Sequence, residues 1–248
     1  GIHARRTNQS SKLGEFLDHW LDSINAVIIN MCIVTSLFLD GWLLILCMTL
    51  VVLSFFATIW EHHHTGVFYS GTMGTNEGLL FVITLFFLLF FFFENPFFRY
   101  NGPGTINIAT LMAYLTIISC IVTLVMILKR MKSNFSDFIP IVSAIIAISL
   151  WTFFGNLDTL MAAGLILSIN IPFCSQFLLQ RLTAFKLGCR NQITVIIALL
   201  SILVLSFNSF IPSNILLYIL AGLIFLTMIL DLKYALNFFN KRKINNSK

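Results

Sequence analysis

Long apolar stretches, separated by short polar segments, recur along the whole chain. A helix needs about 20 apolar residues to cross a hydrocarbon core of about 30 Å. Windows of this kind are predicted near residues 15–38, 41–60, 78–98, 105–128, 138–154, 159–180, 191–210 and 214–236. The stretch from Leu79 to Phe93 is apolar on every face and does not alternate, which favours helices over a transmembrane barrel. The pattern therefore predicts an all-α, polytopic transmembrane bundle of about eight helices.

The composition agrees with a membrane protein. Of the 248 residues, 58% are hydrophobic and 10% are charged, whereas soluble domains carry about one quarter charged residues. No repeat, linker or low-complexity tract divides the chain, and the segments between the predicted spans are short. We therefore expect a single membrane domain over residues 1–248, in which the bundle and its loops carry any chemistry.

The distribution of basic residues says more than the net charge of +5. A positive charge by itself would suit nucleic acid or a membrane surface. When the predicted spans are threaded from the N-terminus, however, every Lys and Arg except Arg99 falls on one side of the membrane. The positive-inside rule assigns that side to the cytosol, and the pattern gives no support to a nucleic-acid partner. The five cysteines have no CxxC spacing and indicate neither a disulfide framework nor a zinc site.

Acidic residues gather at the start of the first predicted span. On a helix, Gly14, Asp18 and Asp22 form one stripe at i, i+4 and i+8, and Glu15 and His19 lie on the stripe beside it. Carboxylates one turn apart repel each other unless an ion or a proton lies between them. Their hard oxygen atoms suit Mg²⁺ or Mn²⁺, and a ligand can approach the backbone at the glycine. The alternative is a solvated helix entrance with ordinary surface charges.

A longer motif favours the metal site over that alternative. Its fixed positions are Gly1, Ala4, Arg5, Gly14, Asp18 and Asp22, in the order G-x2-A-R-x8-G-x3-D-x3-D. This order resembles the signature of the CDP-alcohol phosphotransferase family, D-x2-D-G-x2-A-R-x8-G-x3-D-x3-D. The segment from Ala4 to His19 looks more particularly like the eukaryotic choline/ethanolamine phosphotransferase branch, and so do Trp60-Glu61-His62 with Thr65-Gly66 and the segment from Gly74 to Leu79.

The resemblance implies a larger protein than this chain. Members of the branch have about ten spans, and the signature begins at the cytosolic end of the second. The first two aspartates of the signature would precede Gly1, and the chain begins with a polar segment that has no Met and no apolar signal core. We therefore expect the domain to lack its N-terminal part here. The resemblance also implies a homodimer in the endoplasmic reticulum or Golgi membrane, with its active site facing the cytosol.

The resemblance also assigns roles to residues. Asp18, with Asp22, would hold metal together with the two preceding aspartates, giving two Mg²⁺ or Mn²⁺ ions in the complete protein. The substrate-binding residues would be Gly1, Ala4, Arg5, Gly14, Glu77 and His62. Of these, Arg5 would contact a phosphate, and Gly1 and Gly14 would border the cytidine of the CDP-alcohol.

The implied reaction is attack by a diacylglycerol hydroxyl on the phosphorus of CDP-choline or CDP-ethanolamine, with release of CMP. Such a transfer depends mainly on positioning and charge stabilisation. The hydroxyl proton has two candidate acceptors, His19 and Asp22. We favour His19, oriented by Glu15 four residues earlier, with Asp22 binding metal or sharing the proton.

A second group of histidines and acidic residues is predicted to lie on the same side of the membrane. Glu61, His62, His63, His64 and Glu77 are expected in one loop. Consecutive histidines cannot all converge on one ion, so a zinc cluster is disfavoured. Pocket roles are expected for Glu77 and His62, and an ordinary interfacial position for His63 and His64.

Three alternatives stay open. Phosphatidylinositol and phosphatidylglycerophosphate synthases share the signature but use a water-soluble acceptor and a lipid-bearing CDP donor. A catalytically silent fragment is the second. A transporter is the third, and it ranks lowest because the acids lie at a helix end and no paired broken helices repeat across two halves.

Overall fold

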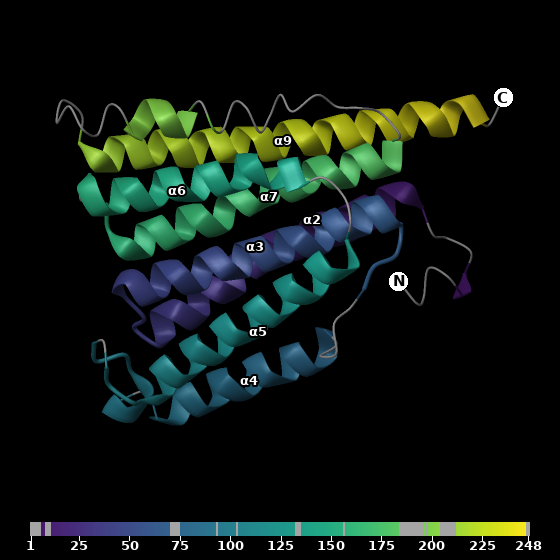
Figure 1. Ribbon diagram of the computed structural model, residues 1–248. Coiled ribbons are helices and arrows are strands. Elements are labelled where there is room, and N and C mark those ends of the chain that lie inside the picture. The colour runs from purple at the N-terminus through teal and green to yellow at the C-terminus, as the bar shows by residue number, and fades with distance from the viewer. Residues whose placement is uncertain are drawn as a thin grey trace.

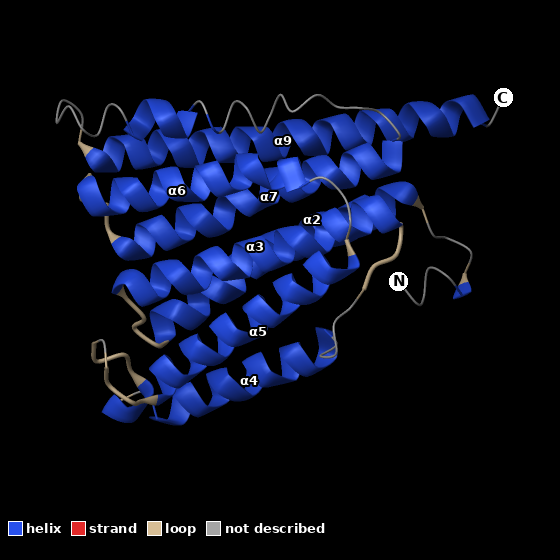
Figure 2. Ribbon diagram, viewed as in Figure 1, coloured by secondary structure: helices blue, strands red, loops and turns tan. Residues whose placement is uncertain are grey.

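The part of the chain that the structure describes consists of helices joined by short turns and loops. This computed structural model describes residues 6–7, 11–69, 75–92, 94–102, 104–131, 135–155, 157–183, 196, 198–203 and 212–246, and none of these forms a strand (Figure 2). The main helices are α2 (Lys12–Ser36), α3 (Gly41–Thr65), α4 (Thr75–Phe92), α5 (Ile108–Arg130), α6 (Phe138–Phe154), α7 (Thr159–Thr183) and α9 (Ser213–Asn246). Two short 3₁₀ turns, η1 (Pro96–Phe98) and η2 (Phe135–Asp137), precede α5 and α6. The predicted all-α class is confirmed.

Five of the described helical segments are long and apolar enough to cross a bilayer, which is the pattern of an integral membrane protein. They are Gly41–Thr65, Ile108–Arg130, Phe135–Phe154, Thr159–Thr183 and Ser213–Phe239, and a shorter apolar helix covers Val82–Phe92. The predicted window at 15–38 also falls on a helix, α2, whose first turns carry the acidic residues. The window at 191–210 lies mostly outside the described residues, of which 198–203 are helical.

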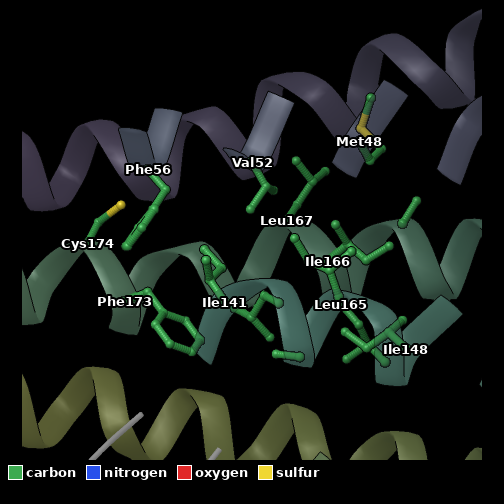
Figure 3. Close-up of a cluster of buried hydrophobic side chains, with 14 of the residues drawn as sticks. Met48, Val52, Phe56, Ile141, Ile148, Leu165, Ile166, Leu167, Phe173 and Cys174 are labelled. Atoms are coloured by element: carbon green, nitrogen blue, oxygen red, sulfur yellow. The ribbon is translucent and has the colours of Figure 1, made fainter. Parts of the chain in front are cut away.

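Helix α7 is the central helix of the bundle. It packs against α2 and α3 on one side and against α6 and α9 on the other (Figure 1). Of its apolar window, 89% is buried, compared with 17% for α5. Figure 3 shows the packing: Met48, Val52 and Phe56 of α3 point toward Leu167 and Cys174 of α7. The buried residues of α7 include the polar Asn170, Ser175 and Gln176, which agrees with a central position because polar side chains in a membrane bundle generally face its interior.

Because neighbouring helices run in opposite directions, the start of one helix lies beside the ends of others. Helix α2 begins, and α3, α5 and α7 end, on the right-hand side of Figure 1. We call this side the polar end of the bundle, because it carries Asp18, His62, Arg130 and Arg181. Arg99 lies at the opposite end, with its guanidinium carbon 4.7 Å from the ring centroid of Phe38. The predicted separation of Arg99 from the other basic residues therefore holds for Arg130 and Arg181.

The first turn of α2 is held by a cap. Ser11 has extended backbone, and its hydroxyl accepts a hydrogen bond from the Gly14 N–H at 3.0 Å. A serine cap satisfies an N–H group that has no partner within the helix. The helix is therefore regular from Lys12, so the spacing of the residues that follow places them on defined faces.

Two glycines give a matched test of the packing. A methyl group at Gly155 would lie 2.2 Å from the Trp151 side chain and 2.9 Å from the Trp151 carbonyl oxygen, whereas one at Gly222 would meet no atom within 4 Å. Overpacking of this kind costs about 1–3 kcal/mol, whereas alanine in place of an exposed helical glycine stabilises by about 0.5–1 kcal/mol. We expect Gly155→Ala to lower the temperature at which the protein unfolds in detergent and Gly222→Ala to leave it unchanged or raised. Equal effects of the two substitutions on heat-induced loss of the size-exclusion peak would contradict this packing.

Candidate active site

The polar residues of α2 differ in solvent exposure according to the face of the helix on which they lie. Phe16 and Ser23 lie seven residues apart, on one face, and both are buried in the bundle. Successive residues turn by about 100° around a helix, so Asp18 and Asp22 point away from that face. Both carboxylates are exposed, and the Asp22 side chain keeps 59% of its accessible surface. The two aspartates therefore form an open acidic row at the polar end, as their spacing predicts.

This row has the donor type that a hard divalent ion requires. Mg²⁺ is commonly held by one or two carboxylates together with substrate phosphates and water. Asp18 and Asp22 supply two carboxylates one helical turn apart, both open to solvent. Within the described residues, no group of three or more His, Cys, Asp and Glu side chains is placed to hold a metal. The acidic row thus fits a divalent ion that takes its other ligands from elsewhere.

Glu15 and His62 meet at the guanidinium of Arg181. The Arg181 Nη1 atom lies 3.0 Å from Glu15 Oε1 and 2.8 Å from His62 Nδ1, and it also contacts His62 Nε2. The three residues come from α2, α3 and α7, so this contact ties three helix ends together. Because an arginine side chain stays protonated and only donates, the carboxylate is neutralised at this point.

His19 lies between the acidic row and this group. Its Nδ1 is 4.0 Å from Asp22 Oδ2, and its ring centroid is 5.6 Å from that of His62. The side chain is 17% exposed, so part of the imidazole remains open to solvent. The carboxylate recorded beside His19 is thus that of Asp22, while Glu15 pairs with Arg181. The orienting role expected for Glu15 stays a prediction.

The expected loop from Glu61 to His64 is wrong, because these residues form the last turns of α3. The helix continues to Thr65 and ends at Gly66, which adopts the left-handed conformation with φ 73° and donates its N–H to the His62 carbonyl at 3.0 Å. Glycine is the residue that adopts this conformation without a steric cost. The helical extension turns His62 toward the bundle, where it is buried.

An ion pair between the exposed Arg130 and the buried Glu61 anchors the segment that follows α3. Arg130 donates from Nε and Nη2 to the two carboxylate oxygens of the buried Glu61, at 2.6 and 2.8 Å. The same guanidinium lies 5.0 Å from the ring centroid of Tyr69. The neighbouring Phe68 ring has its centroid 5.2 Å from that of His19 and 5.2 Å from that of His62. The segment after Gly66 is thereby held against the two imidazoles.

A second contact closes the end of α3 on the other side. The indole N–H of Trp60 donates to Asp137 Oδ2 at 2.9 Å, and His64 Nε2 lies 3.2 Å from the same oxygen. These contacts join α3 to the η2 turn that precedes α6. His64 is thus engaged away from His19, in agreement with the interfacial position expected for it.

A cavity of about 270 Å³ begins one turn inside the bundle from the acidic row. It lies among α2, α3, α5 and α7, and its polar lining residues are Ser23, Asn30, Ser54, Thr58, Thr123 and Asn170. Ser23 follows Asp22, and Thr58 is one turn from His62. The polar end therefore has space beneath it that is lined by hydroxyl and amide groups.

The remaining predicted site residues differ in how far the structure describes them. Gly14 is exposed in the first turn of α2, beside its cap. Gly1, Ala4 and Arg5 lie outside the described residues. For Glu77 only the backbone is described, at the start of α4, so its expected pocket role stays a prediction.

Sequence reasoning missed Arg181, Phe68 and the pairing of Glu61 with Arg130. Both arginines had been counted only as charges that mark one side of the membrane. A signal existed for Glu61 and Arg130, because charges at the ends of apolar spans usually find partners. No periodicity in the sequence indicates which partner each one takes.

Comparison with known proteins gives the family. The family model for CDP-alcohol phosphatidyltransferase matches residues 1–125, half of the chain. This range contains the acidic row, His19, His62 and Phe68. Residues Arg130 and Arg181 lie beyond it.

Curated relatives match over a shorter stretch. A CDP-alcohol phosphatidyltransferase class-I family protein of Schizosaccharomyces pombe is 40% identical over 89 residues, which cover 36% of this chain and 23% of the relative. The choline/ethanolaminephosphotransferase 1 of Saccharomyces cerevisiae is 36% identical over 84 residues, 33% of this chain and 22% of the relative. The cholinephosphotransferase 1 of Xenopus laevis is 34% identical over 92 residues, 36% of this chain and 22% of the relative. The matched stretch thus spans less than a quarter of each relative.

The carboxylates at the start of α2, their signature spacing and the family match agree with one another, and divalent metal ions are typical of this family. The chain belongs to the CDP-alcohol phosphatidyltransferase family.

Proposed function

We propose that the protein transfers phosphocholine or phosphoethanolamine from a CDP-alcohol to the hydroxyl of diacylglycerol and releases CMP. The observation that carries this proposal is the exposed row of Asp18 and Asp22 with His19 beside it. An acidic row for a metal diphosphate and an adjacent proton acceptor are the two elements that phosphoryl transfer to a hydroxyl requires. The names of the yeast and frog relatives support the choice of donor.

Asp18 and Asp22 are the residues of this chain that would hold Mg²⁺ or Mn²⁺, with two ions expected in the complete protein. A bound divalent ion would stabilise the negative charge on the diphosphate and on the departing CMP. The signature assigns Gly1, Ala4, Arg5 and Gly14 to contacts with the CDP-alcohol. The open exposure of the acidic row supports this assignment, because a nucleotide must reach both carboxylates from the aqueous side.

His19 is the proposed general base. Its imidazole is next to the acidic row and partly exposed, so a lipid hydroxyl can approach it. Asp22, at 4.0 Å, is well placed to stabilise the imidazolium that forms when the proton is taken. The rings of Phe68 and His62 pack against the imidazole and limit access of water to it.

Two cavities along α2 suit a lipid acceptor. The polar cavity below Asp22 shares Asn30 with a larger apolar cavity of about 430 Å³ between α2, α3, α4 and α5. The second cavity is lined mostly by aliphatic side chains, among them Ile33, Leu85 and Met112. Both cavities lie along the buried face of α2, whereas the aspartates lie on its exposed face, so the cavities offer space for an acyl chain behind the acidic row. An acceptor that is wholly water-soluble, such as inositol, has no use for the apolar part.

The orientation follows from the charges. We propose an integral membrane protein with the polar end facing the cytosol, because Arg130 and Arg181 lie at that end. The endoplasmic reticulum or Golgi membrane is the location that the family resemblance implies. A homodimer is the association that the family resemblance implies.

The donor and the acceptor can be tested together. In proteoliposomes that contain diacylglycerol, we expect the complete protein to release CMP from CDP-choline or CDP-ethanolamine only when Mg²⁺ or Mn²⁺ is present. The control replaces the donor by CDP-diacylglycerol and the acceptor by inositol or glycerol 3-phosphate. Turnover only in that control would assign the protein to a synthase with a water-soluble acceptor. Turnover in neither mixture would refute an active transferase.

His19→Ala should abolish most of the turnover, because the lipid hydroxyl loses its proton acceptor. General bases contribute about 10²–10⁴-fold, so we expect CMP release to fall by at least about 100-fold while binding of the CDP-alcohol changes little. His64→Ala is the matched control, because His64 lies at the same bundle end but contacts Asp137. Turnover that survives His19→Ala would remove His19 as the base and leave Asp22 as the remaining candidate.

A further inference from the structure

Arg181 occupies an unusual position for a residue that the sequence marks only as a basic charge. It stands in the last turn of α7, the most buried helix among the candidate spans, and its side chain is 23% exposed. A topology charge at a membrane surface normally extends into water or toward lipid headgroups. The Arg181 side chain instead points into the bundle end, where it meets Glu15 and His62.

The chemistry of this contact restricts the histidine. A guanidinium has only N–H donors and no acceptor. The approach of this cation to the ring nitrogens of His62 disfavours a positive charge on the imidazole, so a neutral His62 suits the contact. The contact also fixes the position of the ring, whose centroid is 5.6 Å from that of His19 with the planes inclined at 66°. Arg181 thus holds the aromatic surface against which His19 rests.

The same guanidinium controls a charge. Glu15 lies on α2 one turn before His19 and beside the acidic row. Without a partner it would add a third negative charge to Asp18 and Asp22 and would be available to the imidazole of His19. The pairing at 3.0 Å neutralises it and holds it toward α7. One cation therefore fixes the neighbours of His19 on two different helices.

We propose that Arg181 is a positioning residue for the transfer reaction: by holding Glu15 and His62, it keeps the imidazole of His19 in place beside the acidic row. This inference rests on the proposed function. It differs from a role in substrate binding, in which the guanidinium would contact a phosphate of the donor. It also differs from a purely structural tie between α2, α3 and α7.

Kinetics of the complete protein separate these roles. A misplacement of about 1 Å at a reacting group can cost about 100-fold in rate, so we expect Arg181→Gln to lower kcat by about that factor and to leave the KM for the CDP-alcohol nearly unchanged. Arg181→Lys should recover part of kcat, because it restores the charge but not the planar fork. Lys129→Gln is the control, since it removes an exposed positive charge at the same bundle end. An increase in KM with an unchanged kcat would overturn the proposal in favour of direct substrate contact, and unchanged kinetics would also overturn it.

Chemical rescue distinguishes positioning from folding. In Arg181→Ala, added methylguanidine should restore part of kcat, whereas methylammonium should restore less. A variant that retains the unfolding temperature of the wild-type protein but is not rescued would overturn the proposal. If the alanine variant does not fold, the test uses Arg181→Lys instead. Recovery of part of kcat relative to Arg181→Gln supports the proposal, and no recovery overturns it.

A last measurement does not depend on activity. If the wild-type protein releases no CMP from any CDP-alcohol, the proposed function fails, but the contact can still be tested. The unfolding temperatures of the wild-type protein, Arg181→Gln, Glu15→Gln and the double variant form a double-mutant cycle, which compares the effect of the double variant with the sum of the two single effects. Coupled effects would support the tie on which the positioning role depends, and additive effects would refute it.

Discussion

The cost of placing a charge in hydrocarbon is the constraint on which this structure depends. Apolar helices can cross a bilayer because their backbone groups are satisfied internally, but their charged side chains must reach an end of the bundle or find a partner. Glu15, Asp18 and Asp22 all lie in the first turns of α2, and Arg130 and Arg181 lie in the last turns of α5 and α7. Asp231 is the instructive exception, because it is buried on α9 and accepts a hydrogen bond from Ser175 of α7.

This constraint also assembles the site. Helices that cross the same thickness in alternating directions return their ends to the same two planes, so residues far apart in the chain meet at the polar end. The acidic row comes from the start of α2, and His62 and Glu61 come from the end of α3. Charges that gather at one end are then satisfied by one another, as the Glu61–Arg130 and Glu15–Arg181 pairs illustrate. Charged residues that are excluded from the membrane core thus collect at the bundle end and form a polar site there. Within the described residues, the helix ends themselves supply this site.

The site has two parts: an open part, formed by Asp18 and Asp22, and a supported part, formed by His19 and the side chains packed around it. The aspartates are exposed and have a geometry set by a single capped helix, which suits the proposed binding of an incoming metal diphosphate. His19 is different, because its position depends on His62, Phe68 and, through them, on Arg130 and Arg181. Reacting groups generally need such support, since small displacements are expensive in rate. The family model covers the open part and the supporting rings of His62 and Phe68, whereas the two arginines, Arg130 and Arg181, lie beyond the residues that it matches.

The sequence alone determined the all-α membrane architecture, most of the helices, the row of Asp18 and Asp22 and the separation of Arg99 from Arg130 and Arg181. These features follow from local periodicity and span length, which a linear pattern records directly. The tertiary structure alone decided that α3 continues past Glu61, that Glu15 pairs with Arg181 and that Phe68 lies against His19. Spans that are apolar on every face carry no signal for their rotation or their neighbours, so contacts between helices emerge only when side-chain packing selects one arrangement.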